Sequence, residues 1–153
     1  MHHHILLQRT DSTNPDFRTL VAALDEDLAI RDGAEHSFFA QFNKIDLIKH
    51  VVVAYAGSEP VGCGAIKEYA PATTEVKRMY VPPLHRGKSI ASAVLQELEA
   101  WTKELGYTTC ILETGYKQPE AIRLYQKNHY HTIPNYGQYA GVESSVCFEK
   151  VLG

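Results

Sequence analysis

The residues most clearly suited to binding a ligand lie at 86–91, where the sequence reads Arg-Gly-Lys-Ser-Ile-Ala. This segment separates a β-branched run that ends at Val81 from a stretch with apolar residues at helical spacing. A helix start leaves about four backbone N–H groups without internal partners, and the helix dipole favours negative charge there. Small residues let a phosphate approach these amides, while Arg86 and Lys88 add positive charge. The segment therefore predicts a cradle for a diphosphate.

Two other interpretations of the same segment remain open at this point. Gly87-Lys88-Ser89 is typical of the end of a P-loop, which would indicate a nucleotide-binding enzyme. That motif needs a glycine at position 82, however, and the sequence has Pro82 there. In the simplest alternative, Gly87 and Ser89 only form a tight turn and cap a core helix.

Apolar periodicity predicts the elements that position this segment. Strands are expected at 5–8, 51–56, 61–66, 74–81, 108–113, 130–133 and 144–151. Helices are expected from Pro15 with Asn14 as cap, at 34–42, from about Gly87 to Gly106, and from Pro119 to about Asn128. A mixed sheet flanked by helices, an α/β (α+β) fold, accommodates all of them.

Length and composition indicate one ordinary globular domain. The chain has 153 residues and a net charge of −3 with neutral histidines. Its lysines and arginines form no basic stripe, so we expect no nucleic-acid partner. No apolar run approaches the roughly 20 residues that cross a bilayer, and we expect no membrane partner and a cytoplasmic location. Cys63, Cys110 and Cys147 lie in apolar runs and are expected to be buried, and no metal site is predicted. Residues 1–4 are typical of a tag remnant, with metal binding by the three histidines as the alternative.

Two ordered motifs resemble the GNAT superfamily of N-acetyltransferases. The strand at 75–81 followed by residues 82–91 is similar to the superfamily's signature, a strand and then Arg/Gln-x-x-Gly-x-Gly/Ala. Residues 120–128, Glu-Ala-Ile-Arg-Leu-Tyr-Gln-Lys-Asn, resemble its second segment, a helix with Ala-Ile-x-Leu-Tyr before a strand. The resemblance spans nearly the whole chain. It implies a single domain at 5–153, with a mostly antiparallel sheet of six to seven strands and about four helices.

The resemblance also implies how coenzyme A would be held. Backbone amides of Arg86, Gly87, Lys88, Ser89, Ile90 and Ala91 would bind its diphosphate. Main-chain groups of Met79, Tyr80 and Val81 would bind the pantetheine arm, where the strands at 74–81 and 108–113 splay apart. Three residues depart from the pattern. Ser89 replaces a glycine, Gln118 replaces an asparagine that often contacts the cofactor, and His129 replaces another glycine.

The reaction that the resemblance implies is acetyl transfer from acetyl-CoA to an amine. An alkyl ammonium has a pKa of about 10, so a base must accept its proton, and Glu75 matches the general-base position of some family members. A surface carboxylate paired with a lysine is the alternative for Glu75. Tyr125, in the motif's tyrosine position, would protonate the leaving thiolate, whereas a packed core aromatic is its alternative.

The acceptor is the least determined part of this hypothesis. The resemblance places it among His36, Phe38, Phe39, Tyr136 and Tyr139. Packing is the alternative for these aromatics, and Arg78 either pairs with a substrate carboxylate or is an exposed strand arginine. Small amines, amino acids and peptide amines all remain possible acceptors. A homodimer is also possible. The rival function is an acyl-CoA-binding sensor without turnover.

Overall fold

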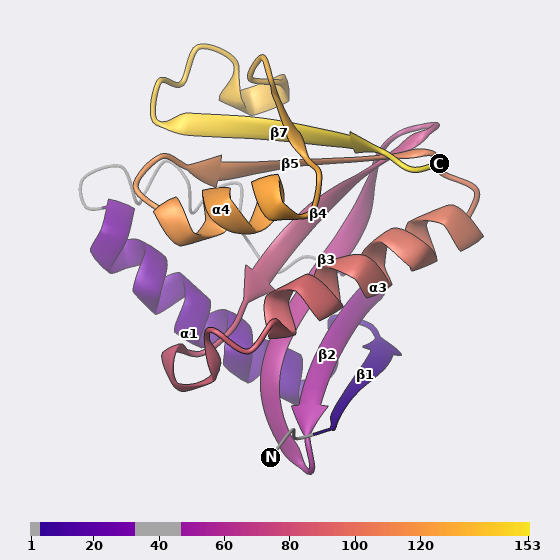
Figure 1. Ribbon diagram of the computed structural model, residues 1–153, viewed down its shortest axis with the longest axis vertical. Coiled ribbons are helices and arrows are strands. Elements are labelled where there is room, and N and C mark those ends of the chain that lie inside the picture. Colours follow the sequence, from indigo (N-terminus) through magenta and orange to yellow (C-terminus); the bar gives the residue numbers. More distant parts are fainter. Residues whose placement is uncertain (1–3, 33–46) are drawn as a thin grey trace.

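The computed structural model describes residues 4–32 and 47–153 (Figure 1). In chain order the elements are β1 Ile5–Thr10, α1 Pro15–Asp32, β2 His50–Ala56, β3 Glu59–Ala70, β4 Thr73–Tyr80, η2 Pro83–His85, α3 Ile90–Glu104, β5 Thr109–Gly115, α4 Pro119–Lys127, β6 His131–Ile133, η3 Gly137–Tyr139 and β7 Ser145–Val151. In this part of the chain the seven strands form one sheet in the order β1-β2-β3-β4-β5-β7-β6. Only the β4–β5 pair is parallel. The predicted mixed, mostly antiparallel sheet is therefore confirmed.

Three of the four predicted helices fall within the described residues. Three α-helices lie within the described ranges, and the helix expected at 34–42 falls outside them. Helix α1 begins as predicted, because the Asn14 side chain accepts a hydrogen bond from the Phe17 amide at 3.0 Å and Pro15 occupies the first turn. Helix α3 ends at Glu104, two residues before the predicted end at Gly106, and Leu105 beyond it is 41% exposed.

The sheet is buried on both faces. Phe17, Leu20 and Val21 of α1 pack with one set of β2 and β3 side chains, whereas α3 and α4 pack on a second core cluster. Successive β2 residues alternate between the clusters: Val51 and Val53 belong to the first, Val52 and Ala54 to the second. Figure 1 shows α3 and α4 in front of the strands and α1 behind them. This double burial explains why β2 reads as a continuous apolar run.

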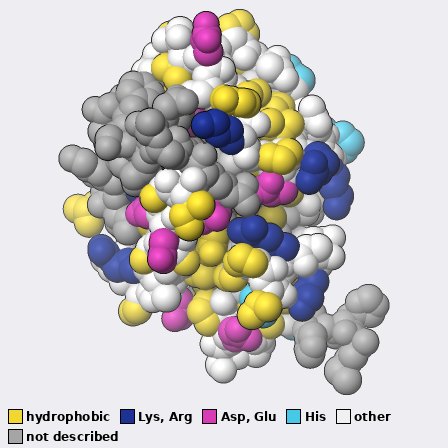
Figure 2. Space-filling model, turned by 90° about the vertical axis from the view of Figure 1, so that its left-hand side faces the viewer, with side chains coloured by type: hydrophobic (Ala, Val, Ile, Leu, Met, Phe, Trp, Pro, Cys, Tyr) yellow, Lys and Arg dark blue, Asp and Glu magenta, His cyan; other side chains and the backbone are white. Residues whose placement is uncertain are grey.

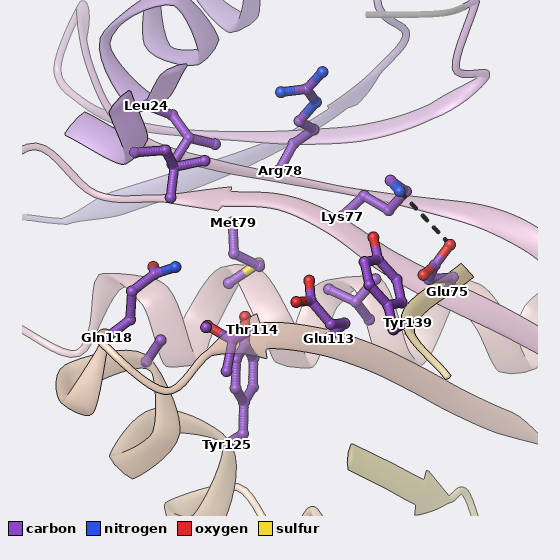
Figure 3. Close-up of a pocket in the computed structure, with 14 residues that line it drawn as sticks. Leu24, Glu75, Lys77, Arg78, Met79, Glu113, Thr114, Gln118, Tyr125 and Tyr139 are labelled. Carbon is purple, nitrogen blue, oxygen red and sulfur yellow. Dashed lines mark ion pairs between the residues drawn. The ribbon is translucent and has the colours of Figure 1, made fainter. Parts of the chain in front are cut away.

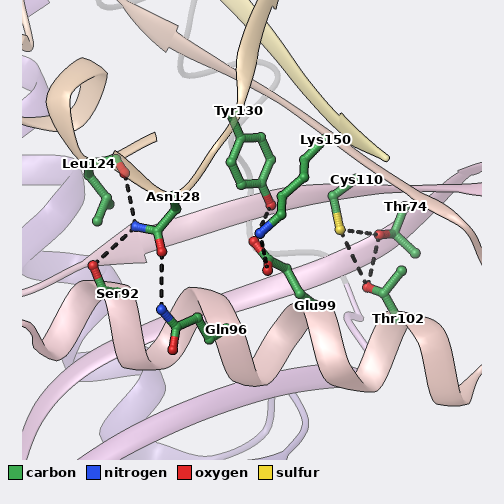
Figure 4. Close-up of polar contacts among 10 residues, drawn as sticks. All are labelled: Thr74, Ser92, Gln96, Glu99, Thr102, Cys110, Leu124, Asn128, Tyr130 and Lys150. Atoms are coloured by element: carbon green, nitrogen blue, oxygen red, sulfur yellow. Dashed lines mark hydrogen bonds and ion pairs between the residues drawn. The ribbon is translucent and has the colours of Figure 1, made fainter. Parts of the chain in front are cut away.

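Buried polar contacts join α3 to the C-terminal strands (Figure 4). The Glu99 carboxylate accepts hydrogen bonds from the Tyr130 hydroxyl at 2.9 Å and the Lys150 ammonium at 2.8 Å. The Asn128 amide nitrogen donates to Ser92 Oγ at 3.1 Å. Because Lys150 lies on β7 and Tyr130 precedes β6, these contacts hold α3 against the end of the chain.

Strands β4 and β5 separate soon after they meet. They pair only at Thr73 with Thr109, Thr74 with Cys110, and Glu75 with Ile111. Beyond Glu75, strand β4 continues to pair with β3, but with one extra residue, since Ala65 faces Lys77 and Cys63 faces Tyr80. A bulge of this kind bends the strand, and Arg78 within it has a φ of 62°. The two parallel strands therefore diverge toward their C-terminal ends (Figure 1).

Two simpler expectations can also be compared with the structure. All three cysteines are buried, as their apolar surroundings predict. Burial raises the pKa of the Cys63 thiol to about 12, so this thiol stays protonated at neutral pH. Within residues 4–32 and 47–153, no helix is long and apolar enough to span a membrane.

Candidate functional site

The divergence of β4 and β5 opens two adjoining hollows. The smaller, about 100 Å³, lies between the strands, with Glu75 and Glu113 among its lining residues (Figure 3). The larger, about 440 Å³, extends toward the start of α3. Both hollows share part of their lining, which consists of Leu24, Met79, Gln118, Ala121 and Tyr125. A ligand lying across them would run from the N-terminus of α3 into the gap in the sheet.

A row of backbone amides precedes α3. The Arg86 amide donates to the Pro83 carbonyl at 3.3 Å, and the next amide with a backbone partner is that of Ala93, which donates to Ser89. Within the described residues, no acceptor contacts the amides of residues 87–92. Gly87 and Ser89 have φ values of 80° and 63°, a left-handed conformation that turns the chain so that successive amides form a concave surface.

Two details of the predicted cradle are wrong. The helix begins at Ile90 rather than near Gly87, because left-handed residues cannot continue a helix. The amide of Arg86 is also unavailable, since it bonds to Pro83. The Arg86 side chain instead supports the loop, because its Nε donates to the Val81 carbonyl at 2.8 Å. That bond also occupies the Val81 carbonyl, one of the main-chain groups expected to bind a ligand.

The larger hollow has a basic wall that the sequence motifs do not reveal. Arg123 and Lys127 lie four residues apart on one face of α4, and both line the hollow together with Arg86. Lys88, predicted to contribute, is not among the lining residues. Figure 2 shows Lys and Arg side chains beside hydrophobic ones on the face seen from the left of Figure 1. Asp27 and Glu120 line the hollow as well, so the positive charge is concentrated on the α4 side, at Arg123 and Lys127.

Glu75 lies where the two strands part. It is the last β4 residue paired with β5 and only 9% exposed. Its Oε2 accepts a hydrogen bond from the Tyr136 hydroxyl at 2.6 Å, and its Oε1 lies 3.7 Å from the Lys77 ammonium. The lysine partner of the simpler interpretation is therefore present, but the carboxylate is buried at the cleft rather than on the surface.

Glu113 faces the same hollow from β5 and was not singled out from the sequence. Its carboxylate accepts a hydrogen bond from Ser145 Oγ at 2.7 Å. The only sequence signal is a carboxylate that ends the apolar run at 110–112. Glu75 and Glu113 thus place acidic groups on both walls of the cleft. Burial and the charge of Glu75 raise the pKa of Tyr136, so its phenol keeps the proton that it donates.

Tyr125 extends from α4 into the space near Met79 and Thr114 (Figure 3). Its ring packs against Tyr130 and Phe148, with ring centroids 5.8 and 5.9 Å away. Burial, followed by the charge of Glu113, raises the pKa of the Tyr125 phenol above its ordinary value. The Tyr125 phenol is therefore a weaker acid than an exposed tyrosine. This hydroxyl is always protonated near neutral pH and suits hydrogen-bond donation better than complete proton transfer.

Residues 10–130 match the family model described as the acetyltransferase (GNAT) family. The chain belongs to this family. It is 35% identical over 102 residues to the IAA acetyltransferase of Azospirillum brasilense, covering 66% of this chain and 67% of that protein. A Klebsiella pneumoniae protein provisionally named an acyl-CoA N-acyltransferase has the same fold, with 31% identity, a TM-score of 0.81, and coverage of 99% of this chain and 100% of that one. The PaiA N-acetyltransferase of Thermoplasma acidophilum, solved in complex with coenzyme A, has a TM-score of 0.70 at 21% identity, covering 97% and 99%.

The departures from the GNAT motifs now have a conformational explanation. Ser89 and His129 replace glycines and adopt φ values of 63° and 72°, a region that glycine enters without strain. The family's glycines therefore meet a backbone requirement that this chain satisfies at some cost. Gln118 precedes α4 and makes no side-chain capping bond, and it lines both hollows. Its amide can therefore reach a ligand in either of them.

The residues expected at the acceptor side of this GNAT protein divide into two groups. His36, Phe38 and Phe39 lie outside the described residues. Tyr139 is buried against the smaller hollow, and Tyr136 reaches Glu75 from the same loop. Arg78 is not the exposed strand arginine of the simpler interpretation, since it is only 6% exposed. It also lines the smaller hollow.

Proposed function

We propose that this GNAT protein transfers an acetyl group from acetyl-CoA to a primary amine. The observation that carries the proposal is the row of unpartnered amides at 87–92, which opens onto a hollow continuous with the gap between β4 and β5. The Thermoplasma acidophilum relative, which was solved with coenzyme A, supports the same ligand here. The alternative, an acyl-CoA sensor without turnover, would not need acidic groups on both walls of the cleft.

The residues present fit coenzyme A. Amides of Gly87, Lys88, Ser89, Ile90 and Ala91 would hold its diphosphate, with Arg123 and Lys127 nearby to add positive charge. Backbone groups of Met79 and Tyr80 that face the gap have no β5 partner and would hold the pantetheine arm. Gln118 lines both hollows and would contact the arm between them. When bound, acetyl-CoA supplies an acetyl group activated as a thioester.

Glu75 would remove the proton from the acceptor ammonium, directly or through one water molecule. An amine must lose this proton before its lone pair can attack a carbonyl carbon. The Tyr136 hydroxyl holds one Glu75 oxygen in place, and the other faces Lys77 at 3.7 Å. Glu113 on the opposite wall is the competing base. Comparison of Glu75→Gln with Glu113→Gln decides between them, because only loss of the true base should lower turnover by about 100-fold or more.

Tyr125 would donate a hydrogen bond to the sulfur that leaves. Its raised pKa keeps the proton on the phenol oxygen, so the donor is present at every working pH. An N–H of Met79 or Tyr80 would stabilise the developing charge on the carbonyl oxygen. Each of these groups lies beside the gap between β4 and β5.

The test combines binding with turnover. Calorimetry with coenzyme A should give a one-to-one complex, and acetyl-CoA mixed with a panel of amines should release free thiol faster than without amine. The three protein thiols are buried and should not interfere with colorimetric thiol detection. Binding without thiol release from any amine would support the sensor instead. Absence of binding would refute the cradle itself.

A further inference from the structure

Arg78 carries two buried N–H groups without partners. Its Nε and Nη2 atoms have no hydrogen-bond partner within the part of the chain that the structure describes. The side chain is only 2% exposed. Among the residues that the structure describes, its ion-pair partner is Asp25, with Nη1 and Oδ1 3.0 Å apart. Buried polar groups are nearly always satisfied in folded proteins, so these two atoms need an explanation, and a ligand that binds them is the one with a test.

The two unpartnered atoms lie on the same edge of the guanidinium group. Nε and Nη2 donate in parallel, and this fork matches the two oxygens of a carboxylate. Asp25 uses only Nη1 and is itself 47% exposed, so it anchors the arginine without covering that edge. An unpaired bidentate donor therefore lies beside the smaller hollow, which Arg78 lines, and both of its atoms are shielded from solvent.

The bulge in β4 determines where this donor points. One extra residue between Lys77 and Tyr80 interrupts the alternation of side chains, so Lys77 and Arg78 extend to the same face of the strand. Figure 3 shows both on the side of α1, opposite Tyr125. The positive φ of Arg78 is strained for a residue with a side chain, and such strain is typical of functional positions.

We propose that the acetyl acceptor is a small amine that also carries a carboxylate, and that Arg78 binds this carboxylate. This inference rests on the proposed function and names its substrate class. The smaller hollow offers Arg78 for the carboxylate and Glu75 or Glu113 for the ammonium, which is the charge pattern of an amino acid. Glu75 and Arg78 are three residues apart, at most roughly 10 Å along a strand. One small molecule can therefore reach both charged groups.

The experiment uses matched pairs of acceptors. The twenty common amino acids, β-alanine and γ-aminobutyrate are each compared with the corresponding carboxamide, which keeps the amine and removes the charge. At least one carboxylate should be acetylated with a kcat/KM about 100-fold above that of its carboxamide, since two charge-assisted hydrogen bonds are lost. In Arg78→Gln this ratio should fall to within about threefold of unity. Arg78→Lys should give an intermediate ratio, because it keeps the charge but not the fork.

A second measurement does not depend on turnover. N-acetyl amino acids, the expected products, should raise the Tm of the parent protein and of the control Arg18→Gln, an exposed arginine of α1, but not that of Arg78→Gln. Coenzyme A should stabilise all three proteins, which shows that each is folded.

Each outcome bears on one hypothesis. Equal use of a carboxylate and its carboxamide, or a preference that persists in Arg78→Gln, would overturn the carboxylate site but leave the acetyltransferase intact. If no amine is acetylated, the proposed function fails. The product-binding Tm shift then decides the role of Arg78 alone, and a parent protein that no N-acetyl amino acid stabilises would refute it.

Discussion

Replacing Tyr125 with phenylalanine removes one oxygen atom from the centre of the cleft. None of the hydrogen bonds formed within the described residues involves this hydroxyl. The ring packing against Tyr130 and Phe148 is preserved, because phenylalanine has the same shape. The free energy of unfolding should therefore change by less than about 0.5 kcal/mol. A large loss of activity in this variant would then report chemistry rather than folding.

The expected loss follows from the raised pKa of Tyr125. A general acid that transfers its proton completely can contribute about 10²- to 10⁴-fold. A phenol whose pKa is raised by burial and Glu113 is too weak an acid for complete transfer to a thiolate of pKa about 8.5. A hydrogen bond to a charged acceptor is worth about 1.5–3 kcal/mol, so kcat should fall about 10- to 150-fold. The Kd of acetyl-CoA should change by less than about threefold.

The pH dependence distinguishes this role from that of an ordinary phenol. Because the folded pKa is raised, the parent keeps its proton through the whole neutral and mildly alkaline range, and the ratio of parent to variant kcat should stay constant from about pH 6 to 9.5. Thiol release measures both kcat values. Tyr107→Phe is the matched control, because its hydroxyl bonds to Glu68 outside the cleft. Equal kcat values for parent and Tyr125→Phe, or a ratio that falls as pH rises, would refute the reasoning.

Three further predictions concern the cradle, the polar network and a buried thiol. Gly87→Asp should bind coenzyme A about tenfold more weakly than Gly87→Asn by calorimetry, because both residues tolerate the left-handed backbone and only Asp repels a diphosphate; equal affinities would move the cradle elsewhere. In urea unfolding, Glu99→Ala should lose about 3 kcal/mol of unfolding free energy, since it leaves Tyr130 and Lys150 without their partner. Glu104→Ala should lose less than about 1 kcal/mol, because the Glu104 side chain is 59% exposed in its ion pair. Similar losses would contradict the network's role. Because the pKa of Cys63 is raised, its contribution to stability is complete below about pH 9 and disappears as pH rises to about 12, roughly 4 kcal/mol in all. The free energy of unfolding of Cys63→Ala should therefore depend less on alkaline pH than that of the parent. Superimposable profiles would show that the thiol does not titrate on unfolding.

The sequence predicts the elements and the cradle because both depend on local patterns. Strand and helix periodicity, Asn14 before Pro15, and the small residues before α3 act within a few positions of each other. These features appear within a few residues of the expected places. The exact start of α3 was missed, since a left-handed serine at position 89 has no strong signal in a single sequence.

The cleft itself could not be predicted in full, because its geometry depends on pairing between distant segments. The bulge at Arg78 exists only relative to β3, and the pairing of β4 with β5 brings Glu113 opposite Glu75. The contact of Tyr136 with Glu75 joins residues 61 positions apart. The burial of Arg78, which rules out an exposed strand arginine, likewise could not be predicted from the sequence.

The bulge in β4 links the divergence of β4 and β5 to the burial of Arg78. Removing one residue between Val76 and Tyr80 would restore regular alternation, straighten β4 and turn the guanidinium toward the opposite layer. The gap between β4 and β5 and the buried guanidinium of Arg78 beside it would disappear together. If Arg78 binds the acceptor as proposed, chain length at this point contributes to recognition as much as the arginine itself. Relatives that lack the additional position should select acceptors by other means, even if they keep an arginine nearby.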